Sequence, residues 1–502
     1  MTISSALPVN ETELLALRER FESYGQGHVF KFFQELEVEG QIALLKQLME
    51  VDVERVNQIY RKAIEGAESS VLNQDTTFEP LPENVFESVL ESSPQKIREW
   101  ETIGLTQIAQ GKVAVILMAG GQGTRLGSSA PKGCYDINLP SKKTLFQLQA
   151  ERILRVQEIA RQYTTAGQLD TCVIPWYIMV SGPTHAPTLD YFKKNNFFGL
   201  KEENVIFFEQ GVLPCLTMDG KIILEAKDKV AMAPDGNGGI YAAVQNKGVI
   251  DSLKKRGILY SHCYCVDNCL ARVADPVFIG YSVSKGTDCG VKVVSKSAPE
   301  EPVGVVCVRD GKYGVVEYSE ISQEVSEKRQ EDGSLQLRAA NIANHFFSTE
   351  FLERVPSFAS QLEYHIAKKK IKFVDEQGET VTPKSNSGMK LECFVFDVFP
   401  YAHHFSVLEV DRKDEFSPLK NAPGTGADCP ETSRRDIVAQ HVRFVEAAGG
   451  KVVHDGDFES LQFELSSWVS YAGEGLADVV AGKTIHTPAV IETKADLIRL
   501  AI

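Results

Sequence analysis

Apolar side chains in the first part of the chain recur at spacings of three and four residues, the pattern of a helix with one buried face. Gly25, Gly27 and Gly40 interrupt this pattern. The helix-like stretches are ETELLALRERFESYG, FKFFQELEVEG, QIALLKQLMEV, DVERVNQIYRKAI and, after the connection TTFEPLPENVF, QKIREWETIGLTQIAQG. The pattern predicts a helical region over residues 1–110. The role we expect for these helices is structural packing, and the alternative is binding of a partner protein or of a second copy of the chain.

From Lys112 onwards the pattern changes to short apolar runs that alternate with helix-like segments such as LFQLQAERILRVQEIARQY. The runs are VAVILMAG, CVIPWYIMV, NVIFFEQ, LYSHCYCVDN, CGVKVVSK and VGVVCVRDG. Nearly continuous apolar strands that alternate with helices predict an α/β fold with a mixed, mainly parallel sheet covered on both faces. We place this central domain at residues 111–405 and expect a smaller C-terminal α+β lobe over residues 406–502.

Composition and charge narrow the class of protein. The chain has 502 residues, of which 43% are hydrophobic and 24% charged, as in ordinary globular proteins. Its formal net charge of -15 argues against nucleic acid as the main partner. The start, MTISSALPVNETELLALRERF, lacks the features of a secretory signal, and no apolar run approaches the roughly 20 residues that span a bilayer. Ten widely spaced cysteines suit reduced thiols. We therefore expect a cytoplasmic protein with no membrane partner. A monomer or weak homodimer is a separate expectation, which composition does not decide.

The stretch MAGGQGTRLG, at residues 118–127, follows the first apolar run and precedes PKG at 131–133. Glycines let backbone N–H groups approach a ligand closely and surround phosphate oxygens. The stretch is neither a Walker A loop, which ends in Gly-Lys-Ser/Thr, nor a G-x-G-x-x-G dinucleotide fingerprint, because Gly127 comes one residue too late. Arg125, and Lys132 after the stiff Pro131, add two cations that suit a polyphosphate.

Together, MAGGQGTRLG and PKG resemble the signature of nucleotidyltransferases that activate sugars, in the form found in the eukaryotic UDP-sugar pyrophosphorylases. The resemblance covers most of the chain and is greatest to the UDP-N-acetylglucosamine (UDP-N-acetylhexosamine) pyrophosphorylases. The further matching motifs are YGQGHVFKFF, QGVLPC, APDGNGGIY, CVDN, VVEYSE, ANIANHFFS, GMKLECFVFD and FSPLKNAPGTGAD.

The resemblance implies that the central domain is a Rossmann-like nucleotidyltransferase domain. The implied enzyme joins UTP and N-acetylglucosamine 1-phosphate to give UDP-N-acetylglucosamine and pyrophosphate. The sugar phosphate attacks the α-phosphorus of UTP, and pyrophosphate leaves in line. Because the attacking oxygen is already ionised, no nucleophile–base pair is needed, and catalysis rests on alignment and charge neutralisation. The resemblance assigns catalytic roles to Arg125, Lys132 and Lys420.

The implied binding residues fall into two groups. UTP would contact Met118, Ala119, Gly120, Gly121, Lys132, Gln210, Gly236, Asp267 and Lys390. The sugar phosphate would contact Asn237, Glu317, Tyr318, Asn341 and Lys420, the last from a loop rich in Pro and Gly that closes over the site. Read from the residues alone, DGNGG is a plain turn, and Lys390 and Lys420 are solvated surface residues.

Asp267 is the metal ligand that the resemblance implies, since Mg²⁺ prefers carboxylate oxygens and Mn²⁺ is an alternative. Asp397 is a candidate for a second ligand. A zinc site made of His262, Cys263, Cys265 and Cys269 is the weaker interpretation. Strand alternation puts His262 and Cys263 on opposite faces, and the spacing is not a standard paired-cysteine pattern.

Three alternative functions stay open at this point. The first is a UDP-glucose or broad-specificity UDP-sugar pyrophosphorylase, because sequence alone cannot size the sugar pocket. The second is a non-catalytic UDP-sugar sensor, although such a protein should have lost the charged residues that are present here. An NADP-dependent oxidoreductase is the third. Its Tyr-x-x-x-Lys spacing occurs at Tyr364 and Lys368, but the glycines here do not open directly into a helix.

Overall fold

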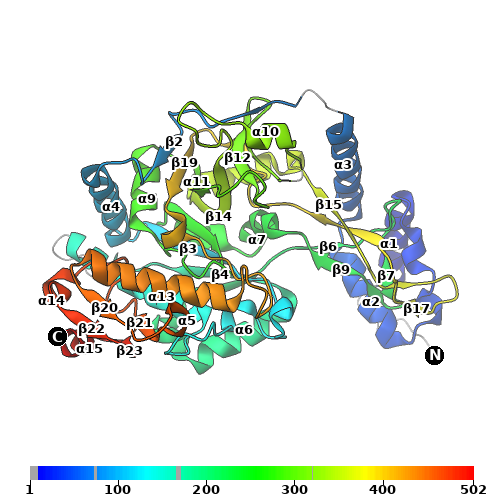
Figure 1. Cartoon of the computed structure of the whole chain (residues 1–502). Helices are drawn as coiled ribbons and strands as arrows, with labels where there is room; N and C mark the ends of the chain where they lie inside the picture. Colours follow the sequence, from blue (N-terminus) through cyan, green and yellow to red (C-terminus); the bar gives the residue numbers. More distant parts are fainter. Residues whose placement is uncertain (1–9, 73–75, 165–170, 319) are drawn as a thin grey trace. The chain divides into compact units, whose positions relative to one another are not determined.

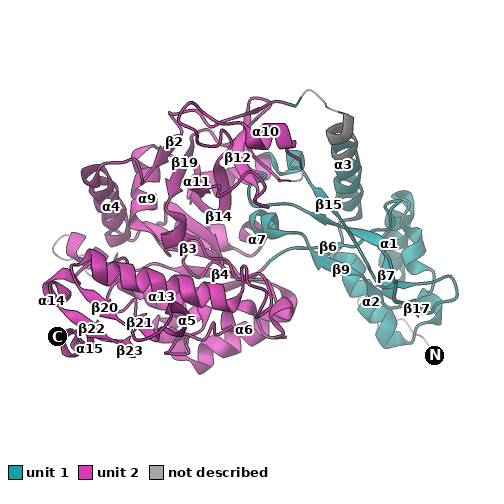
Figure 2. Ribbon diagram, in the orientation of Figure 1, with its two compact units in different colours: residues 1–76, 210–242, 358–397 teal, residues 77–209, 243–357, 398–502 magenta. Residues whose placement is uncertain are grey.

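The computed structural model describes residues 10–72, 76–164, 171–318 and 320–502 (Figure 1). The first nine residues, which begin the stretch without secretory-signal features, lie outside the described residues, as does Ser319 of the motif VVEYSE. Contacts divide the chain into two compact units, each built from separated segments (Figure 2). Unit 1 comprises residues 1–76, 210–242 and 358–397, and unit 2 comprises the rest. The three regions expected from the sequence remain a prediction, because this division does not test them.

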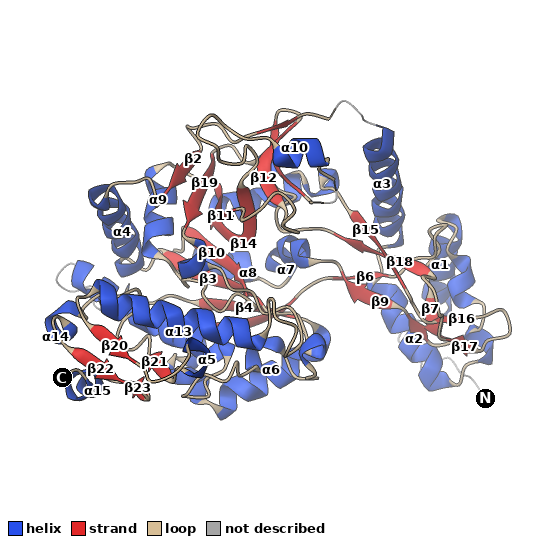
Figure 3. Cartoon of the chain, in the orientation of Figure 1, coloured by secondary structure: helices blue, strands red, loops and turns tan. Residues whose placement is uncertain are grey.

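The centre of unit 2 is a large twisted sheet (Figure 3). Its strands follow the order β2 (Phe86–Ser88), β19 (Phe405–Val410), β11 (Cys289–Ser295), β14 (Ala339–Ser348), β10 (Tyr260–Cys265), β3 (Val113–Met118), β4 (Trp176–Val180) and β5 (Val205–Glu209). Strand β14 is antiparallel to both of its neighbours, and the other neighbouring pairs in this order are parallel. The prediction of an α/β fold with a mixed, mainly parallel sheet is confirmed.

The register brings the carboxyl ends of several strands to one edge of this sheet. Cys265 at the end of β10 pairs with Met118 at the end of β3, which pairs with Met179 in β4. Ser295 at the end of β11 pairs with Ala339 at the start of β14. The segments that follow β3 and β10, and the segment that leads into β14, therefore emerge at the same edge, where ligands bind in folds of this type.

A smaller antiparallel part extends the sheet. Strand β12 (Val305–Arg309) forms a hairpin with β13 (Lys312–Val316) and pairs with β1 (Phe78–Glu79) and, through Val305 and Ala340, with β14. The strand expected from VGVVCVRDG is present, but it is antiparallel rather than part of the parallel series.

Helices cover the sheet of unit 2. They are α4 (Pro94–Ala109), α5 (Leu145–Ala160), α6 (Gly182–Lys194), α8 (Val249–Lys255), α9 (Pro276–Ser284), α10 (Gln323–Glu327) and α11 (Thr349–Arg354). Two of them, α4 and α9, cross with their backbones in direct contact. A Cβ atom added to Gly280 would lie 1.7 Å from the carbonyl oxygen of Trp100, and one added to Gly104 would lie 1.9 Å from that of Pro276. Glycine is required at both positions for this approach. None of the helices that the structure describes is long and apolar enough to cross a bilayer.

The Gly280→Ala substitution should therefore destabilise unit 2. Since the added methyl group meets backbone atoms, the two helices must move apart, and we expect the free energy of unfolding to fall by about 1–3 kcal/mol. Chemical denaturation followed by circular dichroism measures this change. Gly314→Ala is the matched control, because nothing lies within 4 Å of a Cβ atom added there. Equal stability of the two variants would contradict the proposed close contact.

The C-terminal part of unit 2 surrounds its own apolar core. It contains α12 (Arg412–Glu415), α13 (Pro430–Ala447), α14 (Ala477–Val480) and α15 (Lys494–Leu500), with the parallel pairs β20 (Lys451–Val453) with β22 (Thr484–His486) and β21 (Phe463–Leu465) with β23 (Ala489–Ile491). Its core includes Leu126, Leu270 and Leu419, which lie within or next to the motifs MAGGQGTRLG, CVDN and FSPLKNAPGTGAD. Packing in this part thus holds the loops that carry those motifs.

Unit 1 packs the N-terminal helices α1 (Glu11–Ser23), α2 (Val38–Glu50) and α3 (Val53–Leu72) against short strands from later in the chain. These strands form the antiparallel pairs β6 (Val212–Pro214) with β9 (Met232–Pro234), β7 (Leu224–Ala226) with β8 (Lys229–Val230), β15 (His365–Lys369) with β18 (Gly388–Glu392), and β16 (Phe373–Val374) with β17 (Thr380–Val381). Phe21 and Leu44 share one core with Leu216 and Met389, which explains why the unit is discontinuous in sequence.

Two sequence-based predictions about this region are wrong. The stretch FKFFQELEVEG is not an α-helix: 3-10 turns at Gly27–Phe30 and Phe33–Glu35 precede α2. The reason is tertiary, since Gln26 donates to the carbonyl of Gly220 (2.8 Å) and accepts from the N–H of Ile222 (2.9 Å). Gly40 does not separate two helices, because it lies in the first turn of α2.

Candidate active site

The glycine loop, residues 119–123, leaves the carboxyl end of β3. Ala119 is buried and its N–H donates to Met179 (2.8 Å), whereas Gly121 is exposed and a Cβ atom there would meet nothing. The chain then folds back, so that Gly123 N–H donates to Ala130 (3.0 Å) and Lys132 N–H donates to Gly121 (3.1 Å). The next long helix, α5, begins only at Leu145, so the glycines do not open directly into a helix. The result is an open loop in which the N–H groups of Ala119 and Gly123 are used within the fold. Those of Gly120, Gly121 and Gln122 donate to no group among the described residues and are available to an anion.

Pro131 and Gly133, the two neighbours of Lys132 in the motif PKG, hold it beside this loop. Pro131 has a φ of -52°, and a Cβ atom on Gly133 would lie 2.2 Å from the Phe146 ring, so only glycine lets the turn reach α5. The Lys132 Nζ lies 3.5 Å from Asp267 Oδ2, and the two side chains are 17% and 24% exposed. Arg125 is exposed and lies in the 3-10 turn Thr124–Leu126.

Lys420 belongs to the same group of charges. The N–H of Leu419 donates to the carbonyl of Asp267 (2.9 Å). Burial raises the pKa of Cys265 well above its usual value, Asp267 raises it further, and Lys132 and Lys420 act in the opposite direction. Lys132, Asp267 and the Leu419–Lys420 backbone thus lie near the carboxyl end of β10.

Two of the predicted sugar-binding residues meet at Gly304. Asn341 N–H donates to the Gly304 carbonyl (2.9 Å), and a Cβ atom on Gly304 would lie 3.1 Å from Glu317 Oε1. Tyr318, which follows Glu317, is 52% exposed. The chain just before Gly304, residues 301–303, lines a cavity of about 710 Å³ that Lys420 also lines. Lys420 and the residues just before Gly304 therefore line the same cavity of unit 2.

The remaining predicted residues, Gln210, Gly236, Asn237 and Lys390, lie in unit 1. Gly236 has a φ of +87°, and a Cβ atom there would lie 2.3 Å from the carbonyl oxygen of Cys393. Asn237 Oδ1 accepts from Val395 N–H (2.9 Å). Lys390 lies in β18. Burial raises the pKa of Cys215 to about 11, and the charge of Lys390 acts to lower it. The motif APDGNGGIY is therefore packed against GMKLECFVFD.

Asp397, the candidate for a second metal ligand, also lies in unit 1. Its Oδ2 accepts from Phe394 N–H (2.6 Å), and both carboxylate oxygens lie 3.2 Å from His365 Nε2. The Asp397 carboxylate thus has its hydrogen-bond partners within unit 1.

His262 is not positioned for zinc. Its Nδ1 accepts from Ala274 N–H (3.0 Å) and its Nε2 lies 2.5 Å from Asn344 Oδ1, so both ring nitrogens are occupied. Throughout the described ranges, we find no group of three or more His, Cys, Asp or Glu side chains arranged to hold a metal by themselves.

Two further residues were missed by reasoning from the sequence, although both lie within quoted motifs. Asp235, in APDGNGGIY, is 5% exposed and its Oδ1 has no hydrogen-bond partner among the described residues. Cβ atoms added to Gly211 and Gly239 would lie 2.4 Å and 1.8 Å from its carboxylate oxygens. Asn268, in CVDN, is 3% exposed, and both its side-chain Nδ2 and its Oδ1 form hydrogen bonds. Their place inside the quoted motifs was the one signal in the sequence that could have identified them.

The Asp235→Asn substitution should change how stability depends on pH. Burial raises the pKa of Asp235 from 3.8 to about 6, against smaller opposing effects of backbone hydrogen bonding and Arg55. The folded state therefore holds a proton that the unfolded state has lost, and this contribution to stability disappears as pH rises through about 6. Relative to wild type, the variant should gain stability from pH 4 to 6 and then level off, by roughly 3 kcal/mol for a shift of about two units.

Urea denaturation between pH 4 and 8 checks this prediction. Glu379→Gln, an exposed carboxylate of the same unit, is the control. A constant difference between Asp235→Asn and wild type over this pH range would contradict the prediction.

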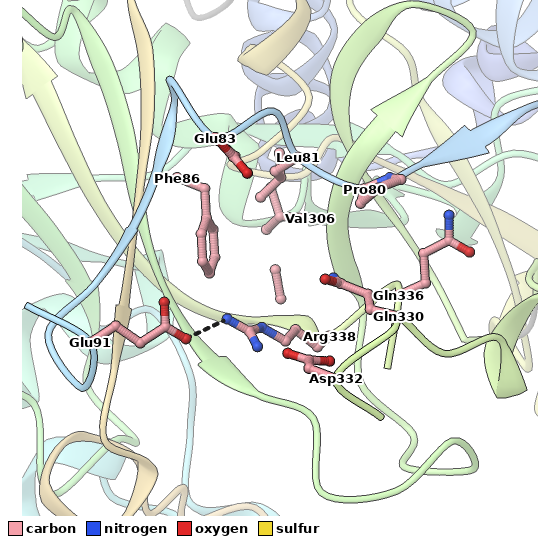
Figure 4. Close-up of a pocket in the computed structure, with 11 residues that line it drawn as sticks. Pro80, Leu81, Glu83, Phe86, Glu91, Val306, Gln330, Asp332, Gln336 and Arg338 are labelled. Carbon is pink, nitrogen blue, oxygen red and sulfur yellow. Dashed lines mark hydrogen bonds and ion pairs between the residues drawn. The ribbon is translucent and has the colours of Figure 1, made fainter. Parts of the chain in front are cut away.

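A second cavity of unit 2, of about 310 Å³, contains none of the predicted site residues (Figure 4). Phe86, Gln336 and Asp332 are among the residues that line it, and Arg338 lies 3.3 Å from Glu91 at its wall. Arg338 also pairs with Glu409 (3.2 Å) and lies over the Phe86 ring, so its charge is already compensated.

Comparison with known proteins gives a consistent result. Residues 54–425 match the sequence profile of a family described as UTP–glucose-1-phosphate uridylyltransferase. A UDP-N-acetylhexosamine pyrophosphorylase-like protein 1 from Homo sapiens is 45% identical over 95% of this chain and 96% of its own length. The UDP-N-acetylglucosamine pyrophosphorylase of Saccharomyces cerevisiae is 42% identical over 95% and 99%, respectively.

Solved structures agree with the sequence matches. The uridine diphosphate N-acetylglucosamine pyrophosphorylase of Trypanosoma brucei, in complex with an inhibitor, is similar with a TM-score of 0.77 and 30% identity over 92% of this chain and 94% of that chain. A UDP-glucose pyrophosphorylase of Leishmania major in complex with UDP-glucose has a TM-score of 0.55 at 16% identity over 76% and 77%, which shows a shared fold.

Proposed function

This chain belongs to the UDP-sugar pyrophosphorylase family, among its UDP-N-acetylglucosamine pyrophosphorylases, and we propose that it transfers uridylyl from UTP to N-acetylglucosamine 1-phosphate. The products are UDP-N-acetylglucosamine and pyrophosphate. The observation that carries the proposal is the group formed by Lys132, Asp267 and Lys420 at the sheet edge beside the glycine loop.

In the proposed reaction, an oxygen of the sugar phosphate forms a bond to the α-phosphorus of UTP. The bond from that phosphorus to the oxygen it shares with the β-phosphorus breaks, and its electrons leave with pyrophosphate. Backbone N–H groups of the glycine loop, Arg125 and Lys132 bind the phosphates of UTP. Lys420 binds the phosphate of the sugar. Since both substrates are polyanions, holding them together and neutralising them is the main contribution of these residues.

A divalent cation fits beside Asp267. Mg²⁺ is usually held by one or two carboxylates together with water and substrate phosphates, and the half-buried Asp267 offers one such carboxylate next to the glycine loop. We propose Mg²⁺, with Mn²⁺ as the alternative. When bound, the ion supplies positive charge that neutralises phosphate oxygens.

The assignments of substrate-binding residues are part of the same proposal. For UTP they are Met118, Ala119, Gly120, Gly121, Gln210, Gly236 and Lys390, in addition to Lys132 and Asp267. For the sugar phosphate they are Asn237, Glu317, Tyr318 and Asn341, in addition to Lys420. The contact of Glu317 and Asn341 with Gly304 supports the sugar assignment within unit 2.

We further propose a cytoplasmic enzyme that is monomeric or weakly dimeric and does not act on nucleic acid. All ten cysteines are free, and the formal net charge is -15. Both observations support reduced thiols and a surface that disfavours phosphate backbones.

A UDP-glucose pyrophosphorylase is the second candidate, because the matching family profile is described by glucose 1-phosphate. Pyrophosphate release with UTP and Mg²⁺ separates the candidates when N-acetylglucosamine 1-phosphate, N-acetylgalactosamine 1-phosphate and glucose 1-phosphate are compared. Strong preference for the N-acetylated sugars is expected. Equal or better use of glucose 1-phosphate would support the second candidate. No release from protein that still binds UTP would indicate a UDP-sugar sensor.

A further inference from the structure

Two chain segments that carry predicted site residues lie antiparallel in unit 2. The first contains Asp267, and the second, residues 415–420, contains Lys420. The N–H of Leu419 donates to Asp267 (2.9 Å) and the N–H of Cys269 donates to the Ser417 carbonyl (3.2 Å). Pro418, which cannot donate a backbone hydrogen bond, faces Asn268 between them. These two backbone hydrogen bonds thus fix the distance between the two segments next to Leu419.

The side chain of Asn268 provides the second connection. Its Nδ2 donates to the carbonyl of Glu415 (2.7 Å), and its Oδ1 accepts from Ser417 N–H (3.0 Å). Asn268 is 3% exposed, so water does not compete for these bonds. A single buried amide therefore holds the chain on both sides of Phe416, a few residues before Lys420.

Glu415 is in turn fixed to the sheet by a buried charge cluster. Lys292 of β11 is fully buried, and its Nζ pairs with Glu415 Oε2 and with Asp275 Oδ2 (2.5 Å). Arg272 Nε lies 3.8 Å from Glu415 Oε1, so two cations face two carboxylates. Burial acts to raise the pKa of Asp275, but the facing cations keep it below its usual value.

Asp275 also connects the cluster to a helix. It is the N-cap of α9, where its Oδ1 accepts from Val277 N–H (3.1 Å). The 415–420 segment is thereby attached to the central sheet and a covering helix, whereas residues 421–427 beyond Lys420 are largely exposed.

We propose that Asn268 and the Glu415–Lys292 pair are positioning residues that hold Lys420 at a fixed place beside Asp267 and Lys132. This inference rests on the proposed function. The Lys420 side chain is long and flexible, so the position of its ammonium group depends on where its backbone is anchored. A displacement of about 1 Å at a reacting group can cost about 100-fold in rate.

The test is a double-mutant cycle measured by pyrophosphate release from the full chain. Asn268→Ala should lower kcat by about 10–100-fold and raise KM for N-acetylglucosamine 1-phosphate, while KM for UTP changes by less than about threefold. If Asn268 acts through Lys420, the same substitution in a Lys420→Ala background should have little further effect.

Thr287→Val is the matched control, because it removes another buried side-chain hydrogen bond of unit 2, to Ser406 (2.7 Å), away from the 415–420 segment. Glu415→Gln tests the cluster separately and should show the same kinetic pattern if it folds. Independent, additive losses, near-normal activity of Asn268→Ala, or an equal loss in Thr287→Val would overturn the inference. Inactive wild type would instead refute the proposed function, and the inference with it.

Discussion

Replacing Lys420 with alanine is expected to slow uridylyl transfer by about 10²–10³-fold, the usual cost of removing one preorganised group that stabilises developing charge. In the proposed site, Lys420 neutralises the phosphate of the attacking sugar, which must approach a second polyanion. Its loss should therefore lower kcat and raise KM for the sugar phosphate more than KM for UTP. Steady-state kinetics of pyrophosphate release, with each substrate varied in turn, measures the three constants.

The fold should be unaffected by this change, because the Lys420 side chain is exposed. Lys413→Ala is the matched control: Lys413 is also exposed and lines the same cavity, but it pairs with Asp411 (3.0 Å). A similar loss in both variants would mean that the general charge of the cavity matters, and would contradict a specific role for Lys420.

Replacing Lys132 with alanine is expected to reduce turnover by a comparable factor of about 10²–10³, with the larger change in KM for UTP. Lys132 lies against both the glycine loop and Asp267, so the substitution removes a cation from the proposed phosphate site and leaves the carboxylate without its partner. Isothermal titration with UTP and Mg²⁺, together with kinetics, separates weaker binding from slower chemistry.

Two variants sharpen this test. Lys132→Arg keeps the charge but replaces a compact ammonium with a larger planar group, so only partial activity should return. Lys142→Ala changes an exposed lysine of the same loop region, which bonds Asn138 (3.1 Å), and should leave activity unchanged. Near-normal activity of a folded Lys132→Ala protein would refute the assignment of that residue.

The two lysine substitutions also distinguish the two halves of the proposed mechanism. If each substrate has its own cation, the KM effects should separate, with UTP affected by Lys132 and the sugar phosphate by Lys420. If instead both lysines act on one substrate, the same KM will rise in both variants, and the order of the substrates in the proposed site must be revised.

Local patterns in the sequence were sufficient for the elements whose neighbours are uniformly apolar. The run VAVILM predicts β3, which is buried along its whole length, and LFQLQAERILRVQEIA predicts α5. Both follow from periodicity, because a strand or helix between two packed layers must present apolar side chains at a fixed repeat. The stretch FKFFQELEVEG has a helical repeat as well, but it forms turns. Just before it, Gln26 donates to the Gly220 carbonyl and accepts from the Ile222 N–H, contacts that a local repeat does not encode.

The sequence by itself determined the fold class, the glycine loop and, through several ordered motifs, the family. These depend on residues that are close along the chain or on motifs that can be compared one by one. Only the tertiary structure decided that Lys132, Asp267 and Lys420 form one group, and that Asn268 and Glu415 anchor the last of them. Those contacts join residues separated by well over one hundred positions, and no local repeat or spacing encodes which distant segments will pack together.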